Sequence, residues 1–161
     1  MRSNSEAERA VEKYADTIRR VCFMHLKNYS DVEDVFQEVF LKYLLHDAPF
    51  ESDDHEKAWL IRVAINACKD VFKSFFRRKV CSLEDIKPEP SYIQEDHKDI
   101  LEAVLKLPDN YKNVIYLFYY EGYTAVEIAK ILNRRENTIY TWLSRAKAQL
   151  KDELGGEFFD R

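Results

Sequence analysis

The chain has 161 residues, a length that suits one ordinary folded domain or two small ones. Of these residues 46% are hydrophobic and 34% are charged, a composition typical of a folded protein and not of a disordered chain. No apolar run approaches the roughly 18–20 residues of a membrane span, and the N-terminal residues lack the apolar stretch of a secretory signal, so we expect a cytoplasmic protein. The formal net charge of −4 would disfavour a nucleic-acid binder, but acidic and basic residues alternate in four blocks, which predicts two basic faces on an acidic chain.

The cysteines give little sign of a metal site or a disulfide. Cys22, Cys68 and Cys81 are far apart and include no CxxC pair, so we expect reduced thiols. Cys22 and His25 share one face of a predicted helix, but no second pair of ligands accompanies them. The pattern favours a buried thiol beside a partly buried histidine over zinc, and no metal or cofactor is predicted.

Three amphipathic helices are predicted in the N-terminal half. The first covers about residues 6–27, and the second follows an expected capping box from Ser30 to Glu33. One face of the second helix is apolar and carries Val32, Val35, Phe36, Val39, Phe40 and Tyr43, whereas the other carries Asp34, Gln37, Glu38 and Leu41. The third covers residues 57–79, and its expected buried side is formed by Trp59, Leu60, Val63, Ala64, Ala67, Val71 and Phe75. These helices alone predict a small bundle.

A change of composition separates this bundle from a second helical unit. Residues 80–95 contain two prolines and scattered acids but no sustained helical period, which predicts a flexible acidic linker. We therefore expect an all-α protein of two small helical domains, residues 1–79 and 96–154, with a short tail at residues 155–161. Within the second domain, Pro108 and Asp109 are expected to begin a helix that ends at Gly122.

The clearest motif spans residues 123–150. Thr124 to Glu127 predicts a second capping box, and Asn133 predicts a left-handed turn between two short-spaced helices. The first helix is expected to bury Val126, Ile128, Ala129 and Leu132, and the second Ile139, Leu143, Ala146 and Leu150. This is the helix-turn-helix pattern, whose second helix presents its N-terminal residues to base edges in the major groove. The competing interpretation is an ordinary solvated bundle helix, which the caps, the small Ala129 and the basic block make less favoured.

Three stretches in this order resemble the sigma-70 family of bacterial transcription initiation factors. The stretch "LPDNYKNVIYLFYYEGYTAVEIAKILNRRENTIYTWLSRAKAQLKDEL" is similar to region 4 of the family. The stretch "DVEDVFQEVFLKYL" is similar to region 2.2, and "WLIRVAINACKD" to regions 2.3 to 2.4. The order, the spacing and the acidic linker match the short, two-domain extracytoplasmic-function (ECF) type over residues 11–154.

The resemblance implies three binding surfaces. Docking on the beta-prime clamp helices of core RNA polymerase would use Asp34, Gln37, Glu38 and Leu41, and region 4 would meet the beta flap. Recognition and opening of the minus-ten element of promoter DNA would use Phe50, Trp59, Arg62, Asn66, Lys69, Lys73, Arg77 and Arg78. Recognition of the minus-thirty-five element would use Arg134, Arg135, Asn137, Thr138, Tyr140, Thr141, Ser144, Arg145 and Lys147.

Finer roles follow from the same resemblance. The segment from Phe50 to Glu56 would be the specificity loop, and the Asn66 amide would hydrogen-bond a flipped base. Trp59 could stack on a base, although core packing is the favoured role. The chain departs from the family at Arg135, where a Ser N-cap is common, and at Tyr140 and Trp142, where basic residues are common. Many family members are also held by an anti-sigma factor.

Two other functions stay open on the sequence. A polymerase-independent regulator would use only the helix-turn-helix, and a sigma-like decoy would bind polymerase without opening promoters. An enzyme is least favoured, because the sequence has no Gly-rich phosphate loop, no H-E-x-x-H and no supported Cys–His set.

Overall fold

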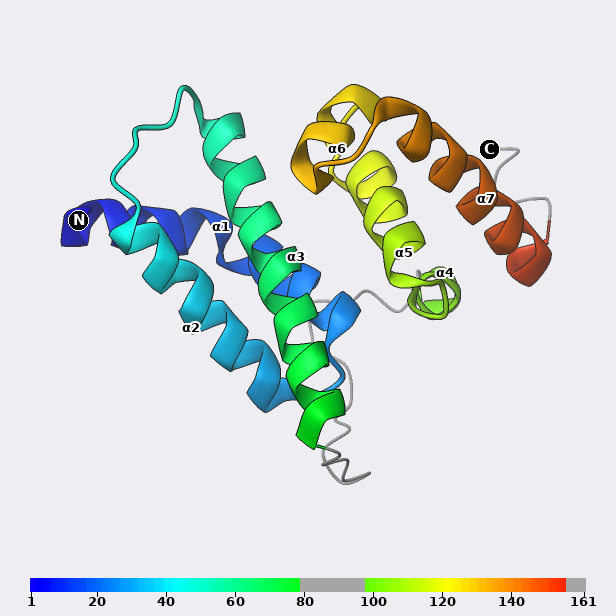
Figure 1. The fold of residues 1–161 in the computed structure, drawn as a ribbon, viewed down its shortest axis with the longest axis horizontal. Helices are drawn as coiled ribbons and strands as arrows, with labels where there is room; N and C mark the ends of the chain where they lie inside the picture. The colour runs from blue at the N-terminus through cyan, green and yellow to red at the C-terminus, as the bar shows by residue number, and fades with distance from the viewer. Residues whose placement is uncertain (79–97, 156–161) are drawn as a thin grey trace. The chain divides into compact units, whose positions relative to one another are not determined.

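The computed structural model describes the backbone of residues 1–78 and 98–155 and the side chains of residues 1–71 and 100–155. Over these residues it contains seven α-helices, one π-helical segment and no strand (Figure 1), which confirms the predicted all-α class. The chain divides into two compact units, Met1–Pro88 and Glu89–Arg161. The predicted linker, residues 80–95, and residues 156–161 of the predicted tail lie outside the described residues.

The first unit is a bundle of three helices, each of which packs against the other two. They are α1 (Asn4–His25), α2 (Tyr29–Leu45) and α3 (Asp53–Arg78), and α1 crosses behind the other two in Figure 1. The largest fully buried side chains of the core are Ile18, Val21, Val32, Val35, Val39, Tyr43, Leu60 and Ile61. Burying each such aliphatic side chain contributes roughly 1.5–3 kcal/mol, so this apolar core is the main source of the bundle's stability.

The capping box predicted at the start of α2 is wrong. Asn28 is the N-cap, and its side-chain oxygen accepts a hydrogen bond from the Asp31 amide at 3.2 Å. Glu33, the expected partner of Ser30, instead accepts a hydrogen bond from Arg19 Nε of α1 at 3.1 Å. Asn caps helices as well as Ser does, so the helix begins one residue before Ser30, which lies exposed in its first turn.

The buried side of α3 is only partly as predicted. Leu60, Ala64 and Ala67 are buried, whereas Trp59, Val63 and Val71 are half-buried and the Phe75 side chain lies outside the described ones. Ile61, Ile65 and Cys68 are buried instead. The reason is that α3 is covered by both α1 and α2, so the contact face is displaced from the single stripe that the sequence suggested.

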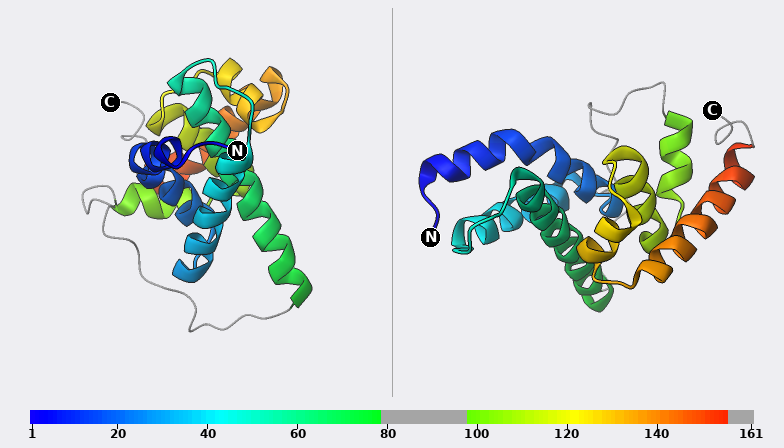
Figure 2. Two further views of the ribbon diagram at one scale, coloured as in Figure 1. Left: turned by 90° about the vertical axis from the view of Figure 1, so that its left-hand side faces the viewer. Right: turned by 90° about the horizontal axis from the view of Figure 1, so that it is seen from above.

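The second unit contains α4 (Lys98–Leu105), α5 (Asp109–Ile115), α6 (Ala125–Leu132) and α7 (Glu136–Leu154). Figure 2 shows the long α7, which packs against α4, α5 and α6. Part of the core is a cluster of Ala103, Val104, Leu107, Ile115, Ala146 and Leu150, contributed by α4, α5, α7 and the turn after α4. As predicted, α5 begins directly after Pro108, and Gly122 adopts a left-handed φ of 79°.

A π-helical segment, η3 (Tyr116–Tyr120), continues α5 and was not predicted. The Glu121 amide donates to the Tyr116 carbonyl at 3.1 Å, five residues back, and the Tyr123 amide donates to the Leu117 carbonyl at 2.9 Å. This wider turn leaves Tyr119 and Tyr120 at 47% and 60% exposure.

Candidate nucleic-acid and protein interfaces

The turn between α6 and α7 has the predicted helix-turn-helix geometry. The Thr124 hydroxyl accepts from the Glu127 amide at 3.2 Å, and the Glu127 carboxylate accepts from the Thr124 amide at 3.0 Å, which confirms the capping box. Asn133 adopts the predicted left-handed conformation at φ 55° and ψ 55°. The Arg134 amide then donates to the Ala129 carbonyl at 2.9 Å, so the path from one helix to the next is fixed by backbone bonds.

Burial on α7 is as predicted, while burial on α6 is not. Ile139, Leu143, Ala146 and Leu150 are all buried. On α6, Ile128 and Ala129 are buried as expected, but Val126 is 39% exposed and Leu132 is half-buried. Ala125 and Ile131 are buried in their place. Because α6 has only eight residues, its apolar positions are too few to predict from sequence which side of the helix packs against its neighbours.

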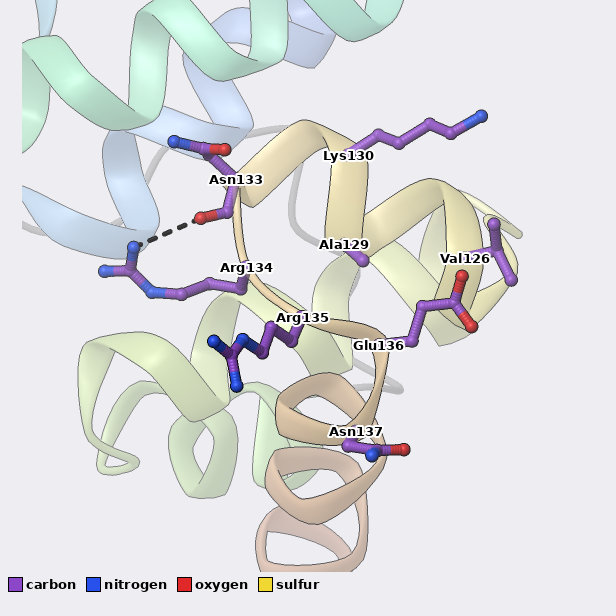
Figure 3. Close-up of a pocket in the computed structure, with 8 residues that line it drawn as sticks. All are labelled: Val126, Ala129, Lys130, Asn133, Arg134, Arg135, Glu136 and Asn137. Atoms are coloured by element: carbon purple, nitrogen blue, oxygen red, sulfur yellow. Dashed lines mark hydrogen bonds between the residues drawn. The ribbon is translucent and has the colours of Figure 1, made fainter.

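The polar side chains of α7 are largely available to a ligand. Arg134, Arg135, Asn137, Tyr140, Thr141, Ser144 and Arg145 are exposed, whereas Thr138 and Lys147 are half-buried. A concave surface at the turn is lined by Val126, Ala129, Lys130, Asn133, Arg134, Arg135, Glu136 and Asn137 (Figure 3). Figure 3 shows Arg134 and Arg135 pointing to one side of the turn, with Glu136 and Asn137 on the other. Arg135 is the N-cap residue of α7, and its side chain makes no capping hydrogen bond.

Two predicted DNA-binding positions, one on α7 and one in the turn before it, have aromatic neighbours. The Lys147 Nζ lies 5.7 Å from the Phe118 ring centroid and 5.5 Å from that of Tyr119. These residues line a second concave surface with Tyr140, Leu143, Ser144, Ala148 and Lys151. The Arg134 guanidinium lies 6.0 Å from the half-buried ring of Trp142. The cations at these positions are therefore held by cation–π attraction, which limits how far they can reach.

On α2, the predicted docking residues form one exposed surface. Asp34, Gln37, Glu38 and Leu41 are all exposed. Leu41 and Leu45 are 55% and 58% exposed, and Lys42 Nζ lies 3.1 Å from Glu38 Oε1. Leu41 and Leu45, one helical turn apart, thus add two exposed apolar side chains to the face that carries Asp34 and Glu38.

On α3, the structure exposes Arg62 and Asn66 and half-buries Lys69. Lys73, Arg77 and Arg78 belong to the same helix, but their side chains lie outside the described ones. Positions 62, 66, 69 and 73 are spaced by three or four residues and so follow one face of the helix. The described part of the predicted basic face is thus accessible.

The segment that joins α2 to α3 rests on an aromatic cluster. The Phe50 ring lies 6.1 Å from that of Tyr43, 5.5 Å from His46, 5.3 Å from His55 and 5.6 Å from Trp59. The half-buried Trp59 ring also lies 4.6 Å from His46. These contacts are what the packing role of Trp59 requires, and they show that Phe50 anchors the segment.

Glu56 is a buried carboxylate that the sequence did not single out. It is 4% exposed and accepts from Arg9 Nη2 at 3.0 and 3.1 Å and from the Tyr43 hydroxyl at 2.7 Å. Burial, and then the Glu56 charge, raise the pKa of Tyr14 above its ordinary value. Glu56 therefore ties the start of α3 to α1 and α2.

Neither a metal centre nor a membrane span is found in the part of the chain that the structure describes. Among the side chains of residues 1–71 and 100–155 no three metal-ligating groups come together, and no helix within residues 1–78 and 98–155 is long and apolar enough to cross a bilayer. Cys22, considered above as a zinc ligand, is buried in the core of the first unit.

Comparison with known proteins connects these surfaces to one family. The family model of Sigma-70 region 2 matches residues 10–79, and that of Sigma-70, region 4 matches residues 97–150. The ECF RNA polymerase sigma factor SigW of Bacillus subtilis (strain 168) is 28% identical, with 89% of this chain and 86% of the relative covered. The RNA polymerase sigma factor SigV of the same organism is 30% identical, with 86% and 84% covered.

A solved structure shares the fold. The sigma factor RpoE of Bartonella quintana, crystallised with the anti-sigma factor NepR, superposes with a TM-score of 0.76 at 21% identity and covers 91% of this chain and 95% of that one. The two region models match in the order that the family has, and the relatives are matched along most of their length. The bundle therefore corresponds to region 2 and the helix-turn-helix to region 4. The chain belongs to the sigma-70 family, as an ECF RNA polymerase sigma factor that acts in transcription initiation.

Proposed function

We propose that this sigma factor docks on core RNA polymerase through α2, opens the minus-ten element with α3 and the segment before it, and reads the minus-thirty-five element with α7. The observation that carries the proposal is the exposed surface of Asp34, Gln37, Glu38 and Leu41 on α2. A regulator that bound DNA by the helix-turn-helix alone would have no use for it.

The chemistry of the α2 surface suits a basic protein partner. Asp34 and Glu38 can each accept charge-assisted hydrogen bonds from arginines, and Gln37 can donate and accept between them. Leu41 adds an exposed apolar contact of the kind found at interface cores. These are the groups expected to meet the clamp helices of the beta-prime subunit, while the second unit would meet the beta flap.

Two DNA surfaces are proposed with different chemistry. At the start of α7 and along it, Arg135, Asn137 and Arg145 offer the guanidinium and amide groups that pair with guanine and adenine in the major groove or with the DNA phosphates. On α3, Asn66 would hold a flipped base, and Arg62 and Lys69 would follow the backbone of the opened strand. Binding energy for extruded bases would drive opening, so the chain itself needs no catalytic group, and we propose that it is not an enzyme.

Location and regulation follow from the same proposal. Core polymerase and promoters lie in the cytoplasm, so the protein would work there. The net charge of −4 predicts weak binding of free protein to promoter DNA, with polymerase supplying most of the affinity. Because the Bartonella quintana relative was crystallised with an anti-sigma factor, we also propose that a partner of this class restrains the present chain.

Charge reversal on α2 tests the docking step. The double variant Gln37→Lys/Glu38→Lys should lower run-off transcription with core polymerase by at least about tenfold, because arginines of the partner would then face lysines. Glu12→Lys, an exposed acid on α1, is the matched control and should keep full activity. Undiminished transcription by the α2 variant would remove the docking proposal, because polymerase would then have to be held by another surface of the chain.

Transcription from fragmented genomic DNA separates the remaining alternatives. With core polymerase and this protein, new RNA 5′ ends should share two upstream elements about one and a half to two helical turns apart. Asn66→Ala should lower their yield if α3 holds a flipped base. Polymerase binding without any new start would identify a decoy.

A further inference from the structure

The segment between α2 and α3, residues 46–52, is in contact with Arg2, which precedes the first helix, α1. Backbone hydrogen bonds give the segment little support: the His46 amide donates to Tyr43, and the Glu56 amide donates to Ser52. The Glu51 amide donates to His55 Nδ1 at 3.0 Å. The Met1 ammonium donates to Asp47, and the His55 amide donates to the Ser52 hydroxyl at 3.1 Å. Ring contacts of His46 and Phe50 and the contacts of Arg2 add to these.

Arg2 contacts both the segment and the end of α2 that precedes it. Its backbone amide donates to the Leu44 carbonyl at 2.8 Å, at the end of α2. Its Nη2 donates to the Ala48 carbonyl at 2.6 Å. Its guanidinium carbon lies 4.8 Å from the Tyr43 ring centroid and 4.7 Å from that of Phe50, so one cation covers two rings that are parallel within 4°.

The Arg2 side chain is largely buried. The Arg2 side chain is 11% exposed, and its Nε is buried without a hydrogen-bond partner among the described residues. A guanidinium that only needed an acidic partner would sit in water beside Glu6, to which Nη1 donates at 3.3 Å. The planar group is instead placed where it can stack on rings and donate to a carbonyl at once, which a lysine cannot do.

We propose that Arg2 is a positioning residue for promoter opening: it holds residues 46–52 against the aromatic cluster, in the conformation that reads the minus-ten element. The inference rests on the proposed function of the segment before α3. Arg2 would act through the segment, by its contacts with the Ala48 carbonyl and the Phe50 ring.

Hydrogen exchange on the isolated protein tests the holding role without any transcription. In Arg2→Ala, the Glu51 amide should exchange at least about tenfold faster, because its bond to His55 exists only while the segment is seated on α3. Amides in the middle of α2 should keep their wild-type rates, which shows that the bundle remains folded. Arg2→Lys should give an intermediate rate, since it keeps a cation near the rings but loses the planar fork.

Promoter choice tests the reading role. On polymerase, Arg2→Ala should reduce by about fivefold or more the ratio of transcription from the preferred minus-ten element to that from a single-base variant, given that one mismatch is worth about 1–3 kcal/mol. Glu6→Gln removes the exposed carboxylate beside Arg2 while leaving its contacts to Ala48 and the rings, and should change neither measurement.

Each outcome decides the inference. Faster Glu51 exchange together with weaker discrimination supports it. Unchanged exchange in Arg2→Ala overturns the holding role, and faster exchange with unchanged promoter choice overturns the reading role. If the wild-type chain itself initiates nothing with core polymerase, the proposed function fails, while the exchange measurement still decides whether Arg2 holds the segment.

Discussion

The replacement Glu56→Gln is the most informative perturbation of the first unit. Glu56 is 4% exposed and accepts hydrogen bonds from α1, through Arg9, and from α2, through Tyr43. Glutamine has nearly the same shape, so packing is kept while the charge and one acceptor are lost. The experiment therefore measures how much the charge of Glu56 contributes to the stability of the contacts among α1, α2 and α3.

The expected loss can be worked from the contacts. The Tyr43 hydroxyl donates to Glu56 over 2.7 Å. In the variant its acceptor is a neutral amide oxygen in place of a carboxylate, which costs about 1 kcal/mol. The Arg9 side chain is 49% exposed, so water screens its ion pair with Glu56 much as it screens a surface pair. Losing this ion pair therefore costs about 1 kcal/mol of stability. Together these predict a fall of about 2 kcal/mol in the free energy of unfolding, or a Tm lowered by about 8–16 °C for a unit of this size.

Thermal unfolding followed by far-ultraviolet circular dichroism measures this loss. Asp54→Asn is the matched control, because it makes the same chemical change on an exposed residue of the same first turn of α3. The reasoning is refuted if Glu56→Gln shifts the first unit's transition no more than Asp54→Asn does.

Three further predictions concern caps, backbone and alkaline pH. Thr124→Ala removes one half of the capping box and should lower the second unit's stability by about 1 kcal/mol in chemical denaturation. At Asn133, where φ is 55°, Ala should cost about 1 kcal/mol and Gly close to nothing, and the opposite order would contradict a strained turn. Burial first, and then the Glu56 carboxylate, raise the pKa of both Tyr14 and Tyr43. The folded state thus favours neutral phenols, so the stability they contribute is complete below about pH 10 and is lost as the pH rises further; Tyr14→Phe should flatten this decline in pH-dependent denaturation.

The helix-turn-helix could be predicted closely because its signals are local. The capping box at Thr124, the left-handed Asn133 and the buried stripe of α7 each depend on residues within about one or two turns of one another. For the same reason the helical period predicted which side of α2 is exposed, whereas the proposed docking role of that side came from the family resemblance. The roles of individual residues in these surfaces remain predictions.

Features that depend on distant or competing residues could not be predicted. Arg9 and Glu56 are 47 positions apart, and nothing in either local sequence marks them as partners. At the start of α2, Asn28 and Ser30 are both good caps, and the choice depends on Arg19 of another helix occupying Glu33. The π-helical turn at Tyr116–Tyr120 has no compositional signal, since its tyrosines would fit an ordinary helix as well.

The aromatic cluster has a practical consequence for spectroscopy. The chain contains two tryptophans: Trp59 lies in the first unit among the rings of Tyr43, His46 and Phe50, and Trp142 lies in the second beside Arg134. Because each unit carries its own indole in its own surroundings, replacing one tryptophan by phenylalanine leaves intrinsic fluorescence that reports on the other unit alone. The order in which the two units lose their structure, or meet a partner, can then be followed optically without an added dye.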